Sequence, residues 1–163
     1  MPHITKHTIQ VLAKSDAVWV EAFVTEHWGA PQIVTRGRVH NAPTLPGFYA
    51  DDDGERIRLV LYHIDGAQCE IVLLNSLREG LGIGSSLVAT VRSAAMDAGC
   101  TRLWLISTND NLPALRFYQR QGFVLAALQR DALTASRRLK PDIPLTGWDG
   151  IPLRDEIELE MRL

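Results

Sequence analysis

Two periods in the placement of apolar residues along the chain predict a mixed α/β protein. Short apolar or alternating runs bounded by turn residues predict strands at residues 8–12, 47–50, 56–63, 68–74, 102–106, 123–127 and 156–163. Apolar spacings of three and four residues predict helices from Ser15 or Asp16 to Gly29, from Ile83 to Gly99, from Asn111 to Gly122, and a short one ending before Pro141. The first strands form hairpins and the later ones alternate with helices. We therefore expect one α/β domain over residues 1–163, with a mixed sheet covered by helices on both faces.

Two further segments differ in how regular their patterns are. Residues 156–163 alternate between charged and apolar side chains, which predicts a strand with one buried face and one wet face. Residues 32–46 show no regular period, so we expect an irregular and partly basic segment there.

A glycine-rich turn joins the strand at 68–74 to the helix that starts at Ile83. It contains Gly80, Gly82 and Gly84. Glycine has no Cβ, so a ligand can approach the backbone N–H groups closely. The first N–H groups of a helix lack internal partners and lie at the positive end of its dipole, so such a turn accepts phosphate. We predict a diphosphate-binding turn; the alternative is a tight turn that merely needs glycine.

The spacing of these glycines excludes two common phosphate-binding motifs. A P-loop requires a Gly-Lys pair, and the chain contains none. A dinucleotide-binding fingerprint requires Gly-x-Gly-x-x-Gly, but Ser85 or Leu87 occupies its third glycine position here.

A second informative segment, residues 109–123, follows the strand at 102–106. Asn111 is placed to cap a helix and Gly122 to end it. Phe117 and Tyr118 lie on one face of that helix together with Ala114, by their spacing.

Together these two segments resemble the acyl-CoA-binding signature of the GNAT superfamily of N-acetyltransferases. The first family motif, Gln/Arg-x-x-Gly-x-Gly/Ala, is similar to residues 79–84, with Glu79 replacing the basic or amide residue. The second, Asn-x-x-Ala-x-x-Phe/Leu-Tyr-x-x-x-Gly-Phe, matches residues 111–123 at every defined position. The likeness is strongest over residues 56–128. It implies the GNAT fold: a mostly antiparallel central sheet in which the parallel strands at 68–74 and 102–106 splay apart.

The resemblance also implies where acetyl-CoA would bind. Backbone N–H groups at the strand end hold the pantetheine and the acyl carbonyl, the glycine turn holds the diphosphate, and the second motif supplies an amide and a phenol. In this sequence these residues are Leu73, Leu74 and Asn75; Glu79, Gly80, Leu81, Gly82, Ile83, Gly84 and Ser85; and Asn111 and Tyr118. A carboxylate repels phosphate, so we expect Glu79 to point outward, with Arg78 supplying compensating charge.

Amide formation from a thioester also requires a neutral amine and a stabilised thiolate. Tyr118, whose free pKa is about 10, can donate a proton or hydrogen bond to a thiolate of acid pKa near ~8.5. Its alternative role is that of a core aromatic residue. Glu70 is the candidate base, and strand periodicity places it on the face of Leu74 if no bulge intervenes. Alternatives are a solvated strand start at Glu70 and deprotonation through a water chain.

The predicted function is therefore acetyl-CoA-dependent N-acetyltransfer to a primary amine by direct attack, without a covalent enzyme intermediate. The alternatives are a non-catalytic CoA-binding or regulatory domain and a nucleotide-binding regulatory domain. In this fold the acceptor enters over the first helix, the loop after it and the connection before the last strand. Candidate acceptor ligands there are Trp28, Arg36, His40 and Arg137, with ordinary solvated charge as the alternative. The expected partner is a small-molecule or peptide amine, and the sequence is compatible with a homodimer.

Composition narrows the remaining classes. With 163 residues, 46% apolar, 22% charged and a net charge of −2, the chain has the character of one globular domain without a basic field for nucleic acid. Cys69 and Cys100 have no close Cys or His partner and predict buried thiols; the histidines form no spaced ligand set, so we expect no metal. No signal-peptide core or membrane span is apparent, and we expect a cytoplasmic protein without a membrane partner.

Overall fold

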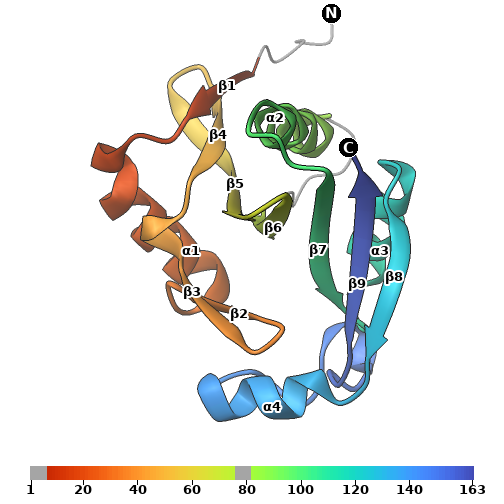
Figure 1. Cartoon of the computed structure of the whole chain (residues 1–163). Helices are drawn as coiled ribbons and strands as arrows, with labels where there is room; N and C mark the ends of the chain where they lie inside the picture. Colours follow the sequence, from red (N-terminus) through yellow and green to blue (C-terminus); the bar gives the residue numbers. More distant parts are fainter. Residues whose placement is uncertain (1–6, 76–81) are drawn as a thin grey trace, which may run out of the picture.

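The computed structural model describes residues 7–75 and 82–163 and contains a seven-stranded sheet (Figure 1). The strand order is β1-β4-β5-β6-β7-β9-β8, and β2 and β3 form a separate hairpin. The strands are β1 (Thr8–Val11), β2 (Gln32–Thr35), β3 (Arg38–Asn41), β4 (Gly47–Asp52), β5 (Glu55–Asp65), β6 (Gln68–Leu74), β7 (Arg102–Thr108), β8 (Val124–Gln129) and β9 (Glu156–Arg162). The helices are α1 (Ala17–Trp28), α2 (Ile83–Asp97), α3 (Leu112–Arg120) and α4 (Ala132–Leu139). No helix in these two described ranges is long and apolar enough to cross a membrane.

The parallel pair of the sheet is formed by β6 and β7, and the other neighbouring strands described are antiparallel. The β6–β7 pairing runs from Gln68↔Arg102 to Ile71↔Leu105. Beyond that point the last three residues of each strand are no longer partners. This confirms the predicted mixed, mostly antiparallel sheet with a splay between its parallel strands.

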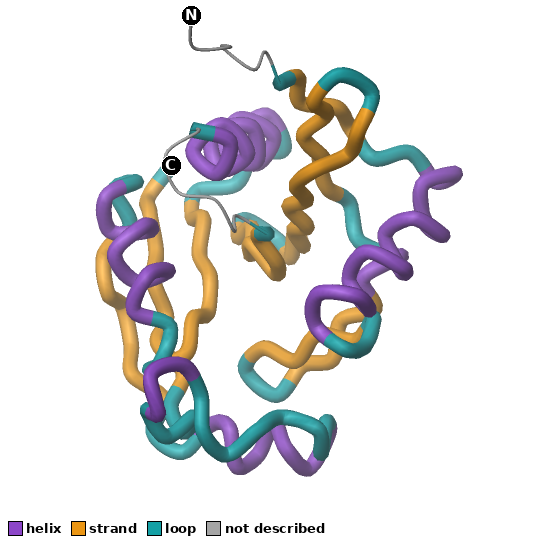
Figure 2. Tube along the Cα trace, turned by 180° about the vertical axis from the view of Figure 1, so that it is seen from behind, coloured by secondary structure: helices purple, strands orange, loops and turns teal. Residues whose placement is uncertain are grey.

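Helices cover both faces of the sheet, as the sequence predicts. Helices α2 and α3 pack on one face, where Leu87 and Val91 of α2 lie in one apolar cluster with Leu105 and Leu159. On the other face Val24 of α1 packs in a second cluster with residues of β5 and β6. Figure 2 views the molecule from behind and shows α3 in front of β7, β9 and β8, whereas Figure 1 draws it behind them.

The predicted helix ends depend on backbone conformations that glycine adopts readily. Gly29 ends α1 with φ 83°, and Gly122 follows α3 with φ 102°. At the other end of α3, the side-chain oxygen of Asn111 accepts a hydrogen bond from the N–H of Ala114 at 3.2 Å. The predicted cap and stop of this helix are therefore confirmed.

Two expectations from the sequence were wrong. Residues 32–46 are not irregular, because they contain the β2–β3 hairpin, whose turn is Arg36 (φ 49°) and Gly37 (φ 72°). Such turns usually carry Asn-Gly or Asp-Gly, and Arg-Gly gives no comparable signal. The glutamate face of β9 is also not wet: Glu156 and Glu158 are only 2% and 7% exposed. The hairpin, α4 and β7 supply the groups that cover them.

Candidate active site

A β-bulge in β6 decides which side chains face each side of the sheet. The register between β5 and β6 shifts so that Val72 is the extra residue. A bulge interrupts the alternation of side chains. As a result Leu74 packs with the cluster under α2, whereas Leu73 packs with the cluster under α1. Glu70 therefore shares a face with Leu73, and the conditional expectation that it shares one with Leu74 was wrong because the bulge intervenes.

The face of β6, β7 and β9 turned away from α2 and α3 carries mostly charged side chains, and we call it the charged face. Trp104 of β7 lies between Glu70 of β6 and Glu160 of β9 in the strand register. The charged face consists of Glu70, Arg102, Trp104, Glu156, Glu158 and Glu160, approached by Arg36, Arg38 and His40 of the β2–β3 hairpin and His63 of β5.

Glu70 is the most enclosed carboxylate of this set after Glu156, with 3% exposure. Its Oε2 lies 3.5 Å from Nε2 of His40, and the same nitrogen lies 3.1 Å from the hydroxyl of Thr35. Its other oxygen, Oε1, has no hydrogen-bond partner among the residues that the structure describes. Buried polar atoms normally have a partner. Oε1 is therefore a buried acceptor whose hydrogen-bonding capacity no described residue uses.

Two carboxylates of β9 lie near Glu70 and are held by the hairpin and β7. Glu158 forms ion pairs with Arg36 at 3.1 Å and with Arg102 at 2.7 Å. Glu156 accepts hydrogen bonds from the backbone N–H of Arg36 at 3.2 Å and from the hydroxyl of Ser136 at 3.4 Å. Burial raises the pKa of Glu156, and the charge of Glu70 adds to that increase, although these two hydrogen bonds oppose it.

A pocket of about 290 Å³ opens on the charged face beside Glu70. Its lining residues are Arg36, Arg38, His63, Asp65, Gln68, Glu70 and Trp104. Burial lowers the pKa of His63, and the nearby Arg38 and His40 lower it further. The imidazole of His63 is therefore largely neutral at pH 7. Its ring centroid lies 5.5 Å from that of His40.

Tyr118 lies on the opposite side of the sheet, in the cluster under α2 and α3. Its ring makes edge contacts with Phe117 and Phe123 and is 8% exposed. Burial raises the pKa of Tyr118, so its hydroxyl stays protonated at neutral pH. Within 7–75 and 82–163 that hydroxyl makes no hydrogen bond. The ring therefore packs as a core aromatic residue, and the protonated hydroxyl keeps an unused hydrogen-bond donor.

The strand end and helix start that the sequence assigns to acetyl-CoA are described in part. Gly82 is the N-cap of α2 with φ 69°, and no side chain caps this helix. A Cβ added at Gly82 would meet no described atom within 4 Å. Of the residues that follow it, Ile83 and Gly84 are buried, and Ser85 accepts a hydrogen bond from the side-chain amide of Gln121 at 2.9 Å.

Asn75, at the end of β6, is 2% exposed, and neither polar atom of its side chain has a partner in the described part of the chain. Glu79, Gly80 and Leu81 lie outside the described residues. Helix-start N–H groups without a described side-chain cap, and no described atom near the Cβ position of Gly82, fit a bound diphosphate.

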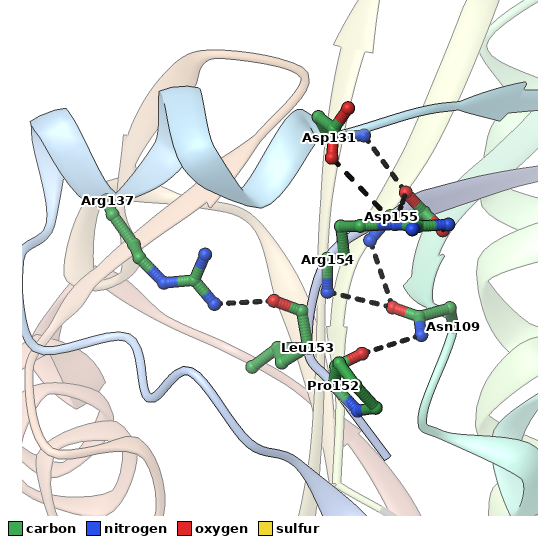
Figure 3. A network of polar contacts seen from close by, with 7 residues as sticks. All are labelled: Asn109, Asp131, Arg137, Pro152, Leu153, Arg154 and Asp155. Atoms are coloured by element: carbon green, nitrogen blue, oxygen red, sulfur yellow. Dashed lines mark hydrogen bonds and ion pairs between the residues drawn. The ribbon is translucent and has the colours of Figure 1, made fainter.

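Two of the four predicted acceptor ligands join this site and two do not. Arg36 lines the pocket and His40 contacts Glu70. Trp28, at the end of α1, is not among the pocket-lining residues. Arg137 donates to the carbonyl oxygen of Leu153 (Figure 3). It also donates to the carbonyl oxygens of Ile143 and Pro144 and thereby holds the chain after α4 in place.

Asn109 holds the end of the segment between α4 and β9 against the end of β7. Its side-chain oxygen accepts hydrogen bonds from the N–H groups of Arg154 and Asp155, and its amide donates to Pro152 (Figure 3). The side chain of Arg137 is used in hydrogen bonds to the segment between α4 and β9, so the prediction that Arg137 is an acceptor ligand was wrong.

Sequence reasoning missed several residues of the charged face, namely His63, Arg102, Trp104, Glu156 and Glu158. The available signal was the alternation in the two strands. In β9 glutamates alternate with Ile157, Leu159 and Met161, and in β7 Arg102 and Trp104 alternate with the buried Leu103 and Leu105. What no pattern indicated was that the β2–β3 hairpin and α4 would cover these side chains.

Comparison with known proteins agrees with this fold. The chain is 43% identical over 136 residues to the uncharacterized protein YdhI of Bacillus subtilis (strain 168), covering 83% of this chain and 85% of that one. A Bacillus subtilis acetyltransferase crystallised in complex with CoA superposes with a TM-score of 0.67 at 18% identity, over 97% of this chain and 99% of that one. A GNAT family acetyltransferase from Elizabethkingia anophelis with acetyl-CoA bound gives a TM-score of 0.64 at 19% identity, over 96% and 98% of the two chains.

The family is established by sequence. The model of the acetyltransferase (GNAT) family matches residues 15–123, which include α1, the hairpin, Glu70 and the second predicted motif. The chain therefore belongs to the acetyltransferase (GNAT) family.

Proposed function

We propose that the protein is an acetyl-CoA-dependent N-acetyltransferase that acetylates a primary amine by direct attack. The observation that carries this proposal is the position of Glu70, a buried carboxylate with one unpartnered oxygen, next to the point where β6 and β7 separate. Membership of the family and the CoA-bound and acetyl-CoA-bound neighbours support acetyl-CoA as the donor.

Acetyl-CoA supplies an acetyl group activated as a thioester. In direct attack the amine nitrogen bonds to the carbonyl carbon, the C–S bond breaks, the amine loses a proton and the sulfur gains one. The amine must be neutral, although a lysine-like amine has a free pKa near ~10.4 and an α-amine near ~8. Glu70 accepts the amine proton at Oε1, while His40 holds Oε2. His63, near His40 and largely neutral, offers a route for that proton to the solvent.

The other requirements fall to the strand end and to α3. Among the described residues, the edge of β6 that faces β7 has no strand partner after Ile71, and its N–H groups would bind the acyl carbonyl oxygen. Asn111 keeps its amide N–H₂ for the pantetheine arm, because the helix cap uses only its oxygen. Tyr118, held protonated by burial, donates to the departing sulfur.

The chemistry of the cysteine in β6 favours direct attack over an acyl-enzyme. Cys69 neighbours Glu70 in sequence but lies on the opposite face, in the apolar cluster. Burial, with smaller contributions from Cys100 and Glu70, raises the pKa of the Cys69 thiol to about 12. A thiol rather than a thiolate is present at neutral pH, and a thiol is a weak nucleophile.

The test is a thiol-release assay with acetyl-CoA and a panel of primary amines, run beside thermal-shift measurements with CoA, ATP and NAD. We expect amine-dependent release of CoA and stabilisation by CoA alone. Stabilisation by CoA without thiol release from any amine would instead support the non-catalytic CoA-binding alternative. Stabilisation by ATP or NAD without CoA would support a nucleotide-binding regulator.

Two glycines at opposite ends of α2 provide a matched test of the diphosphate site. Gly82 (φ 69°) and Gly99 (φ 81°) both adopt positive φ, and a Cβ at either would meet no described atom within 4 Å. Gly82→Ala and Gly99→Ala should each cost about 1 kcal/mol of backbone strain. Only Gly82→Ala should weaken acetyl-CoA binding, as isothermal titration calorimetry would show. Equal affinities for the two variants would refute the assignment.

A further inference from the structure

We infer that the acceptor is a small amine that also carries an anionic group, with its amine at Glu70 and its anion at Arg38. This inference rests on the proposed function, because it names the substrate class of that same site. It is carried by two residues that line one pocket: Glu70, whose buried Oε1 has no described partner, and Arg38, whose guanidinium has none either.

The size of the pocket limits the acceptor. Its volume of about 290 Å³ lies at the lower end of the ~300–1,000 Å³ range of sites that enclose drug-sized ligands. Trp104 forms one wall, and the guanidinium groups of Arg36 and Arg102 lie 5.4 and 5.5 Å from its ring centroid. A molecule of amino-acid size fits this space.

The three arginines at the pocket differ in what already neutralises them. Arg102 bonds Glu158 at 2.7 Å and Glu160 at 2.5 Å, and Arg36 pairs with Glu158 at 3.1 Å. Arg38 makes no ion pair or hydrogen bond through its side chain within the described ranges. Arg38 is therefore the arginine of the pocket lining whose charge has no described partner, and its guanidinium can pair with an anion.

The two ends of the pocket also differ in solvation. Glu70 lies at the buried end, where a cationic amine is held strongly and can transfer its proton. Arg38 is exposed, where a charged ligand group keeps part of its hydration. Asp65 shares that exposed end and is screened by solvent, so it competes weakly with Glu70 for the amine.

The charges of the pocket lining favour a zwitterion over the alternatives. Arg36 is already paired with Glu158, whereas Arg38 has no partner among the described residues, so a ligand with both an amine and an anion can pair with Glu70 and Arg38 together. A simple monoamine would leave Arg38 without a partner. A diamine would bring a second cation toward Arg36 and Arg38, and the repulsion would disfavour it.

The first experiment compares matched amines at low ionic strength. Amino acids are paired with their carboxamides, and O-phosphoethanolamine with ethanolamine, so the arms separate carboxylate from phosphate as the anion. We expect kcat/KM to be about tenfold or more higher for the anionic member of at least one pair, the size of one charge-assisted hydrogen bond. Equal values within every pair, or higher values for the members that lack the anionic group, would overturn the inference while leaving the acetyltransferase proposal intact.

The second experiment removes the cation. Arg38→Gln should raise KM for the preferred anionic amine about tenfold and leave its kcat nearly unchanged. The kinetic constants for the matched amine that lacks the anionic group should not change. Arg92→Gln, an exposed arginine of α2 on the other side of the sheet, is the matched control and should match the wild type. An Arg38→Gln enzyme that still prefers the anionic amine as strongly as the wild type would contradict the role of Arg38.

Calorimetry of amine binding without acetyl-CoA keeps the inference testable if no turnover is found. The pocket assignment is supported if the wild type binds the anionic member of a pair more tightly and Arg38→Gln does not. This result would hold even if no amine released thiol and the proposed function were wrong. Equal binding of both members of every pair would defeat the pocket assignment by itself.

Discussion

The two faces of strands β6, β7 and β9 differ sharply although they are built from alternate residues of the same strands. On the face under α2 and α3, Cys69, Ile71, Leu103, Leu105 and Leu159 are all at most 3% exposed and apolar. On the charged face the residues beside them are Glu70, Arg102, Trp104, Glu158 and Glu160. The two faces thus share one backbone, and only side-chain chemistry distinguishes them.

The comparison separates what stabilises the fold from what serves the chemistry. Apolar burial is favourable and needs no exact partner. Buried carboxylates cost desolvation and contribute little net stability even when paired. A folded chain that retains Glu70, Glu156 and Glu158 in partly covered positions therefore keeps them for another reason, and substrate chemistry supplies one. Tyr118 lies in the apolar cluster, whereas Glu70 lies on the charged face near the point where β6 and β7 separate.

The largest effect should come from the apolar face. Leu103→Ala removes a fully buried side chain and should lower the free energy of unfolding by about 2–5 kcal/mol. Glu160→Gln, in the same sheet on the charged face, removes one partly exposed ion pair and should cost at most about 1 kcal/mol. Urea unfolding of both variants measures the difference. Similar losses would mean that the charged face stabilises the fold as much as the apolar face does.

The next effect is on catalysis. The apolar face should matter more for stability, whereas the charged face should matter more for the rate. Glu70→Gln should lower kcat on the order of 10²–10³-fold at pH 7, because the amine loses its proton acceptor. The loss should shrink as pH rises, since neutral amine then becomes abundant without a base. A pH–rate profile measures this recovery.

The control for that profile is Glu160→Gln, which makes the same change of charge away from the pocket lining. Its rate should follow that of the wild type at every pH. A Glu70→Gln enzyme slowed equally across the whole pH range would identify Glu70 as a positioning residue and not a base.

Tyr118→Phe tests the contribution from the apolar side. The ring and its contacts with Phe117 and Phe123 remain, and the lost hydroxyl makes no hydrogen bond to the described residues. Stability should therefore stay the same or rise slightly, while kcat falls by ~10²-fold and acetyl-CoA binding hardly changes. Wild-type turnover, with chemistry shown to be rate-limiting, would leave Tyr118 as a core aromatic residue only.

The elements of the fold that the sequence predicts correctly are those whose signals lie within their own residues. Helix α3 was predicted closely because its cap Asn111, its apolar spacing and its stop Gly122 all lie within its own sequence. The parallel pair and its splay came from the family resemblance and not from periodicity. The β2–β3 hairpin was missed because its Arg36-Gly37 turn uses an uncommon residue for positive φ.

The candidate site was predicted less completely because it depends on tertiary contacts. Glu70 and His40 were identified singly, but their 3.5 Å contact joins strands that are not neighbours in any sheet. Because Val72 is an extra residue in the pairing with β5, Glu70 lies on the same face as Leu73. Such a bulge cannot be recognised from the sequence when the residues around it are all apolar. Glu156 and Glu158 looked like a solvated strand face because the segments that cover them lie far away in sequence.

The smallest expected effect is a gain in stability from the charged face. Burial raises the folded-state pKa of Glu156 above its ordinary value, so its stabilising contribution is fully present below the unfolded pKa and is lost as pH rises through the folded pKa. Glutamine resembles the protonated form, so Glu156→Gln should gain up to about 1 kcal/mol at pH 7 and lose that advantage as the pH falls toward the ordinary glutamate pKa near ~4.3. Urea unfolding of both proteins from pH 4 to 7 measures the trend. A loss of stability at pH 7 would show instead that the hydrogen bonds from Arg36 and Ser136 to the carboxylate outweigh its desolvation, and the charged face would then resemble the apolar face in supporting the fold.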